Sequence, residues 1–226
     1  MAQLPMDADI IVFAKAPIPG RVKTRLSPPL TSETATTVYA AMLEAVLKRV
    51  ATMAGRAWLA ITPDDATIEA RGLTVTPQGD GDLGARLRRV SARVWAKREQ
   101  SAGCQIIIGT DSPDLPIERF HEAREAAMEG RVAVVPAFDG GYCLIASPRA
   151  APELFEAIEW GTPRVMRQTR QAATRANLPL TELEPWHDVD TLDDVFALRK
   201  RLASVTEPAL TRLRESLDSA KLPLGS

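Results

Sequence analysis

One short segment, CQIIIG (104–109), constrains the fold more than any other part of the chain. It is almost wholly apolar and is followed at once by the polar turn TDSPDLP (110–116). A strand that is apolar on both faces is typical of a parallel sheet covered by helices on each side. The segment therefore predicts a buried central strand with an acidic loop at its carboxyl end.

Further apolar, β-branched runs alternate with longer segments of helical spacing. Strands are expected at 8–14, 56–61, 73–77, 131–137 and 141–147. Helices are expected from Thr31 or Ser32 to about 54, after Pro63, from about 82, up to about 130, at 163–176 and from about 192. This order predicts a Rossmann-like, three-layer α/β/α fold with a mostly parallel sheet. Such sheets bind ligands at the carboxyl ends of their strands, so the loops after the first, fourth and fifth strands are candidate sites.

Length and composition fit a folded protein of one domain. The chain has 226 residues, of which 45% are hydrophobic and 25% are charged. We expect one domain over 1–204 and a surface helix with a loose tail over 205–226. The formal net charge of −1 provides no overall positive field for nucleic acid or an anionic membrane. No apolar run approaches the roughly 20 residues that span a bilayer, and the first residues lack a signal-peptide pattern. We therefore expect a cytoplasmic protein.

A basic loop, AKAPIPGRVKTRLSPPL (14–30), directly follows the first strand. Its cations are Lys15, Arg21, Lys23 and Arg25, and Gly20 lets backbone approach a ligand closely. Four cations at the carboxyl end of a strand can hold a di- or triphosphate. The alternative for any one of them is a solvated surface charge. The spacing of a Walker loop is absent.

Two acidic segments are candidates for a metal site. Asp111 follows the central strand, and Asp188 and Asp190 share one face of an extended segment. The three carboxylates together could hold Mg²⁺ or Mn²⁺ against phosphate oxygens. The alternatives are turn and capping roles: Asp114 is well placed to cap the helix near residue 116, and Asp190 or Thr191 to start the last helix.

Two glycine-containing loops offer further contacts. In AFDGGYCLIA (137–146) a tight turn exposes amides, and its side chain Asp139 could bind a sugar hydroxyl or act as a base. We expect the acceptor substrate to be bound by Asp139, Gly140, Gly141 and Tyr142. The alternative is that these residues form only a β-turn. In TPQGDGDLGARL (76–87) the start of a helix could present amides to a base or ribose. Its candidates are Gly79, Asp82 and Gly84.

Nucleophilic catalysis is not indicated. Cys104 and Cys143 lie in apolar runs and are expected to be buried, reduced thiols. His187 borders the carboxylate pair and is a candidate ligand or proton carrier, with a structural role as the alternative. No Ser-His-Asp or Cys-His order with supporting context is present.

Five ordered segments resemble a known family. They are FAKAPIPGRVKTRL, GTDSPDLP, FDGGYCLIA, EWGTPRVMRQT and HDVDTLDD. They are similar to those of the bacterial glycosyltransferase A-like family associated with arsenosugar biosynthesis, over about residues 8–202. The resemblance implies a nucleotide-diphospho-sugar transferase fold with a metal-bound nucleotide.

A more distant resemblance concerns nucleotidyl transfer. VKTRL, the Asp-x-Pro after a strand, and DVDT are similar to parts of nucleotidyltransferases that make molybdenum-cofactor nucleotides and guanylylated 2-phospholactate-type precursors. This resemblance implies that Lys23 and Arg25 contact phosphate. It also implies that Asp111, Asp188 and Asp190 bind metal.

Three functions follow from the residues and these resemblances. The first is a glycosyltransferase that moves a sugar from an NDP-sugar to a small acceptor. The second is a nucleotidyltransferase that joins an NMP from an NTP to a phosphorylated or carboxylated acceptor. The third is a non-catalytic sugar-nucleotide-binding protein. For the two enzymes the expected catalytic residues are Asp111, Asp139, Lys23 and Arg25, and the expected partners are a nucleotide or nucleotide sugar and a small acceptor, without nucleic acid or membrane.

Overall fold

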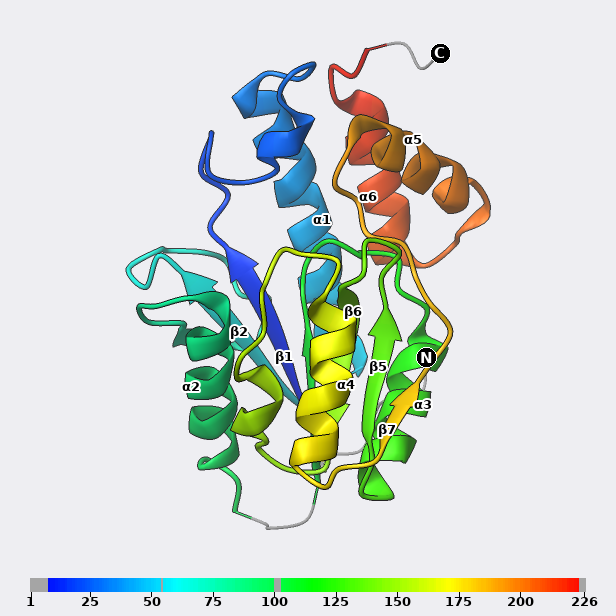
Figure 1. Ribbon diagram of the computed structural model, residues 1–226. Coiled ribbons are helices and arrows are strands. Elements are labelled where there is room, and N and C mark those ends of the chain that lie inside the picture. The colour runs from blue at the N-terminus through cyan, green and yellow to red at the C-terminus, as the bar shows by residue number, and fades with distance from the viewer. Residues whose placement is uncertain (1–7, 54, 100–102, 224–226) are drawn as a thin grey trace.

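A seven-stranded sheet lies between two layers of helices in the computed structural model, which describes residues 8–53, 55–99 and 103–223 (Figure 1). The strands are β1 (Ala8–Lys15), β2 (Arg56–Thr62), β3 (Thr74–Pro77), β4 (Cys104–Ile108), β5 (Val132–Pro136), β6 (Tyr142–Ser147) and β7 (Leu180–Glu182). Their order is β3-β2-β1-β4-β6-β5-β7, and only β6 runs antiparallel to its neighbours. The expected three-layer α/β/α fold with a mostly parallel sheet is confirmed.

The helices cover both faces of this sheet. They are α1 (Ser32–Met53), α2 (Leu83–Trp95), α3 (Ile117–Met128), α4 (Val165–Arg175), α5 (Leu192–Arg201) and α6 (Pro208–Ser219). Alternate residues of β1 face opposite layers: Ile10 and Val12 belong to the core under α1 and α3, and Ile11 to the core under α2 and α4. All five residues of β4 are buried, as expected for a central strand.

A third apolar cluster joins the C-terminal helices to α1. Leu210, Leu213 and Leu217 of α6 are buried at helical spacing against α1 and α5. Val189 contributes to the same cluster. Figure 1 shows α5 and α6 beside α1 at the end of the sheet where the parallel strands finish. Helix α6 thus packs on α1 near the loops at that edge.

Two local predictions were wrong. Residues 63–73 form bends and turns rather than a short helix. Arg71 and Gly72 have positive φ angles of 53° and 90°, which a right-handed helix does not accept. Strand β7 was missed because its three residues are too few to give a period.

The polar loops meet at the carboxyl edge of the sheet. The loops after β1 and β4 lie side by side because these strands pair in parallel. Since β6 is antiparallel, its first residue, Tyr142, also lies at this edge. The chain after β7 reaches the same place through a bridge between Ala137 and Trp186. Within the described residues, no helix has the length and apolar character needed to cross a membrane.

Candidate functional site

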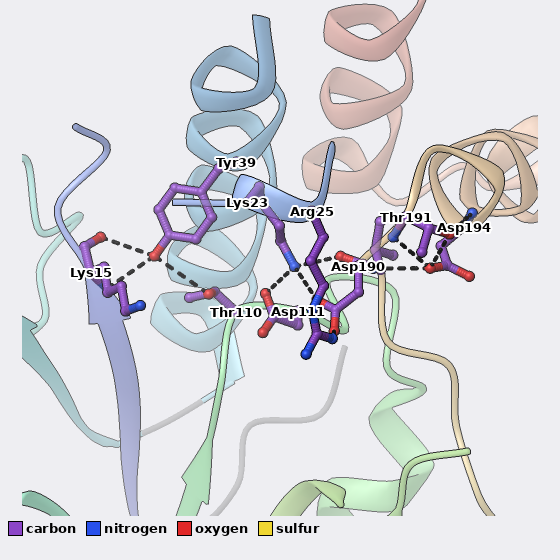
Figure 2. A network of polar contacts seen from close by, with 10 residues as sticks. Lys15, Lys23, Arg25, Tyr39, Thr110, Asp111, Asp190, Thr191 and Asp194 are labelled. Carbon is purple, nitrogen blue, oxygen red and sulfur yellow. Dashed lines mark hydrogen bonds and ion pairs between the residues drawn. The ribbon is translucent and has the colours of Figure 1, made fainter. Parts of the chain in front are cut away.

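A buried lysine joins three of these loops. The Lys23 side chain is only 5% exposed and forms ion pairs with Asp111 and, at 3.1 Å, with Asp190 (Figure 2). It also donates a hydrogen bond to the Val189 carbonyl. Burial lowers the pKa of Lys23, but the two carboxylates outweigh this effect and hold the pKa above its ordinary value. The ammonium therefore stays charged and ties the loop after β1 to the loop after β4 and to the 186–190 segment.

A second cation and a tyrosine complete this wall. Arg25 lies 3.0 Å from Asp190 and keeps 69% of its side chain exposed. The Tyr39 hydroxyl donates to the Lys15 carbonyl at 2.9 Å and accepts from the Lys15 amide at 3.0 Å. Figure 2 shows the Thr110 side chain on the far side of the same hydroxyl. The carboxyl end of β1 is therefore held in one position.

Three carboxylates form a compact acidic group. Ligand oxygens of Asp139, Asp188 and Asp190 all lie within 4.8 Å of one another. Burial and the charge of Asp139 raise the pKa of Asp188. The expected trio contained Asp111 in place of Asp139. The Asp111 carboxylate is instead paired with Lys23, and Asp139 is held by a 2.8 Å hydrogen bond from the Gly141 amide.

Two connected hollows surround these groups. The larger is a cleft of about 700 Å³, whose wall includes Lys15, Lys23, Arg25, Tyr39, Gln78, Asp82, Arg86, Thr110, Asp111, Asp139 and Asp190. The smaller is a cavity of about 170 Å³, lined by Gly109, Asp111, Ser112, Ala137, Asp139, Gly141, Tyr142, Cys143, Asp188 and Asp190. Because Asp111, Asp139 and Asp190 line both, the carboxylates mark their boundary. Two ligands could meet there.

Of the remaining candidates in the basic and glycine loops, some line the cleft and others do not. Asp82 lines the cleft and also caps α2, accepting a 2.7 Å hydrogen bond from Ala85. A Cβ on Gly84 would lie 2.7 Å from the Phe155 carbonyl oxygen, so close packing explains this glycine. Gly20, Arg21 and Gly79 lie outside the described lining of both hollows.

The surroundings of residue 140 explain why it is a glycine. Its φ is 92°, and an added Cβ would lie 2.7 Å from atoms of Pro163. The Gly140 carbonyl also accepts a 2.9 Å hydrogen bond from the Met166 amide at the start of α4. The tight turn expected at 137–141 is thus pinned to α4.

The expected capping role of Asp114 is wrong. Helix α3 begins after Pro116 without a side-chain cap. The buried Asp114 carboxylate accepts hydrogen bonds from Arg201 at 2.6 Å and Trp186 at 3.3 Å. Capping of α5 falls to Thr191, in a reciprocal pair with Asp194, and this leaves the Asp190 carboxylate free for the two cations.

Several residues of the cleft gave no signal in the sequence. Tyr39 lies within the apolar pattern of α1, and Gln78 sits among small and turn residues. The Gln78 amide donates to the carbonyls of Ala14 and Ala60, at 2.9 and 2.8 Å. Arg86 belongs to the polar face of α2. Only the tertiary fold brings these side chains to the cleft.

The cysteine and histidine candidates have ordinary surroundings. Cys104 and Cys143 are free of disulfides, as expected. Burial raises the pKa of Cys143 to about 12, so its thiol stays protonated at neutral pH. His187 packs against Phe138 at a tilt of 42°, with ring centres 4.8 Å apart, and also contacts Trp186.

The fold is shared with several solved structures, among them a nucleotide-diphospho-sugar transferase. A provisionally assigned nucleotide-diphospho-sugar transferase from Desulfovibrio desulfuricans G20 is 27% identical, with a TM-score of 0.82 over 95% of this chain and 98% of that one. A 4-diphosphocytidyl-2C-methyl-D-erythritol synthase is 12% identical, with a TM-score of 0.57 over 88% of this chain and 100% of that one. The manganese complex of Rv0371C from Mycobacterium tuberculosis H37Rv is 20% identical, with a TM-score of 0.50 over 88% of this chain and 98% of that one.

Sequence comparison adds a family. No curated protein matches the chain. The expected association with arsenosugars stays a prediction. The family described as "Uncharacterized protein conserved in bacteria (DUF2064)" matches residues 44–162, which is more than half of the 226 residues. The chain therefore belongs to the DUF2064 family.

Proposed function

We propose that this protein is a metal-dependent transferase of nucleotide-activated substrates, and that it moves a sugar from an NDP-sugar to a small acceptor. One observation carries the proposal. The 700 Å³ cleft has Lys15, Lys23 and Arg25 on its wall together with carboxylates that border a second cavity. A donor with a diphosphate needs the cations, and an acceptor needs a separate space beside the reacting bond.

The donor diphosphate would lie near the basic loop. Lys23 and Arg25 both pair with Asp190, and Arg25 is the more exposed of the two. Its guanidinium can bind phosphate through two parallel hydrogen bonds. The nucleoside would extend toward Gln78 and the start of α2, which line the same cleft. The similarity to the Desulfovibrio protein, over 95% of this chain, supports a sugar nucleotide as donor.

The acidic group fits a hard divalent cation. Its donor atoms are all carboxylate oxygens, which Mg²⁺ and Mn²⁺ prefer, and three lie within 4.8 Å of one another. Asp139, Asp188 and Asp190 would hold the ion, and Asp111 is the fourth carboxylate that lines the smaller cavity. When bound, the ion stabilises the negative charge of the departing diphosphate. The manganese complex of the related fold supports this assignment.

In the proposed reaction the acceptor oxygen bonds to the sugar carbon as that carbon's bond to the diphosphate breaks. The diphosphate leaves as NDP with the bonding electrons, and the acceptor hydroxyl passes its proton to a carboxylate of the wall, for which Asp139 is our candidate. Asp139 lines both hollows and is our candidate for orienting this hydroxyl. Lys23 holds Asp111 and Asp190 in place on the same wall.

Nucleotidyl transfer is the second candidate. Lys23 and Arg25 contact the acidic group directly, as cations would if the bond broken lay at a phosphorus atom. An acceptor phosphate or carboxylate would then attack the α-phosphate of an NTP and release pyrophosphate. The likeness to the diphosphocytidyl-methylerythritol synthase supports the fold for this reaction.

A product assay separates these reactions. The protein would be incubated with Mg²⁺ or Mn²⁺, a panel of NTPs and NDP-sugars, and small acceptors. Release of NDP from an NDP-sugar supports glycosyl transfer, and release of pyrophosphate from an NTP overturns it. Nucleotide binding without either product would support the non-catalytic alternative.

A further inference from the structure

The short segment that carries Asp188 is held at both ends by the loop after β4. At one end the Trp186 indole donates a 3.3 Å hydrogen bond to the buried Asp114 carboxylate. At the other end the Val189 amide donates a 2.8 Å hydrogen bond to the Asp111 carbonyl. Asp188 lies between these two points of attachment. The position of its carboxylate therefore depends on that loop from both sides.

Trp186 is also fixed to the turn that carries Asp139. Its amide donates a 2.9 Å hydrogen bond to the carbonyl of Pro136, the last residue of β5, and Ala137 pairs with Trp186 in an isolated bridge. Asp139 follows this bridge by two residues on one segment, and Asp188 follows it by two residues on the other. The place of Trp186 thus bears on the distance between two carboxylates of the acidic group.

The C-terminal helix α5 fixes Asp114 in turn. Arg201, the last residue of α5, donates from Nε to the Asp114 carboxylate at 2.6 Å, and the Asp114 side chain is only 5% exposed. The carbonyl of Pro113 accepts a 2.8 Å hydrogen bond from Arg49, a buried residue of α1. Two helices therefore hold the loop through buried arginine contacts.

We propose that Asp114 is a positioning residue for the divalent-cation site. Arg201 orients the Asp114 carboxylate, and this carboxylate orients the Trp186 indole, whose segment carries Asp188. Asp114, Trp186 and Arg201 lie outside the described lining of the cleft and of the smaller cavity, so they act on the ion through its ligands. Partners that orient metal ligands commonly decide metal affinity. The inference rests on the metal site of the proposed function and adds residues outside the acidic group.

Removal of the indole donor is the first test. Trp186→Phe keeps an aromatic ring and deletes one hydrogen-bond donor. We expect it to weaken Mn²⁺ binding about tenfold in calorimetric titration of the full-length protein. The matched control is Trp95→Phe, at the last residue of α2 and outside the described lining of both hollows, which should bind Mn²⁺ like the wild type. Wild-type affinity in Trp186→Phe overturns the inference.

Two double variants separate positioning from the stability that the ion pair provides. Arg201→Met with Asp114→Asn removes both charges but keeps an oxygen that can accept from the indole. Arg201→Met with Asp114→Leu removes both charges and that oxygen. We expect the second to bind Mn²⁺ about tenfold more weakly than the first. Equal affinities in the two would mean that the Asp114 oxygen does not position the site, whatever their melting temperatures.

A coupling measurement completes the test. Trp186→Phe added to the variant with Asp114→Leu should cost no further Mn²⁺ affinity, because the hydrogen bond is already absent. A full additional tenfold loss would contradict the proposed contact.

The two levels of the proposal fail in different ways. A wild-type protein that does not bind Mn²⁺ overturns the metal site of the proposed function, and the inference with it. Wild-type Mn²⁺ binding that Trp186→Phe leaves unchanged overturns the inference alone.

Discussion

Lys23 and Asp190 are separated by 167 positions in the sequence, and the Lys23 ammonium lies 3.1 Å from an Asp190 carboxylate oxygen. The same ammonium pairs with Asp111 and donates to the Val189 carbonyl. One side chain therefore closes the wall between the first basic loop and the last segment of the site. Its removal should affect both folding and the charge of the site.

Lys23→Met is expected to lower the free energy of unfolding by about 1–3 kcal/mol, because the Val189 carbonyl and two carboxylates lose a buried partner. Mg²⁺ should then raise the melting temperature of the variant more than that of the wild type, since a cation relieves the repulsion that remains. Thermal unfolding with and without Mg²⁺ measures both effects. Lys200→Ala, an exposed lysine of α5, is the control. Equal melting temperatures for variant and wild type would contradict the role.

The metal assignment depends on which carboxylates act together. Asp188→Asn and Asp139→Asn should each weaken Mn²⁺ binding by about 10–100-fold or more, because each removes one of three grouped ligands. Asp111→Asn should weaken it less if Asp111 serves Lys23 rather than the ion. Calorimetric titration with Mn²⁺ provides the affinities.

The control for these variants is Asp80→Asn, an exposed carboxylate near the cleft but outside its described lining. It should bind Mn²⁺ like the wild type. If Asp111→Asn loses more Mn²⁺ affinity than the other variants, Asp111 is a metal ligand, and the assignment of the ion to Asp139, Asp188 and Asp190 is wrong. Unchanged affinity in Asp139→Asn would remove that residue from the site.

Gly140 should tolerate no side chain. Gly140→Ala combines a positive φ of 92° with a Cβ 2.7 Å from Pro163, whereas Gly72→Ala has a φ of 90° and open space around it. Both variants carry similar backbone strain, so their difference isolates the clash. We expect Gly140→Ala to be the less stable by about 1–3 kcal/mol in urea denaturation. Equal midpoints would mean that the 137–141 turn is not pinned to α4.

The capping box at α5 makes stability depend on pH. Burial raises the pKa of Asp194, but hydrogen bonds from the Thr191 side chain and from the Thr191 and Asp190 amides outweigh it and hold the pKa below its ordinary value of 3.8. A lowered pKa in the folded state stabilises the fold fully above that ordinary value, and the stabilisation is lost as pH falls through the folded-state pKa.

Asp194→Ala should therefore cost about 1 kcal/mol at pH 7, and its difference from the wild type should shrink below pH 3.8. Denaturation at several pH values measures this. The control is Asp193→Ala. Asp193 lies in the same first turn of α5 but makes no capping hydrogen bond in the described structure, so this change should lower stability less than Asp194→Ala. A difference that persists undiminished at pH 2 would rule out a carboxylate contribution.

The strands, and the sheet edge at which the site lies, could be predicted from the sequence because their patterns are local. The short apolar run CQIIIG predicted a buried strand, and its parallel pairing with β1 places both following loops at one edge. The basic loop was identified as a run of one charge after a strand, and the DVD segment by the spacing that puts two carboxylates on one face of an extended segment.

The membership of the acidic group could not be read in this way. Asp111 follows β4 and Asp139 follows β5, and no local pattern shows that Asp139 rather than Asp111 has a carboxylate oxygen within 4.8 Å of those of Asp188 and Asp190. Asp114 likewise had a local reason to cap α3, but Arg201, 87 positions away, offered a buried charge that needed a partner. Long-range ion pairs leave no period or spacing in a sequence.

Comparison of Arg25 with Arg21 tests whether the basic loop contacts phosphate through one particular side chain. Arg25 lines the cleft and lies 3.0 Å from Asp190, whereas Arg21 is exposed and outside the described lining. Arg25→Ala should change the unfolding free energy by less than about 0.5 kcal/mol, since the side chain is mostly solvated. It should weaken binding of Mg²⁺-nucleotide about tenfold through loss of a phosphate contact. Arg21→Ala should do neither, as calorimetric titration with UDP or GDP can show, and equal losses in both variants would mean that the loop acts only through its overall charge.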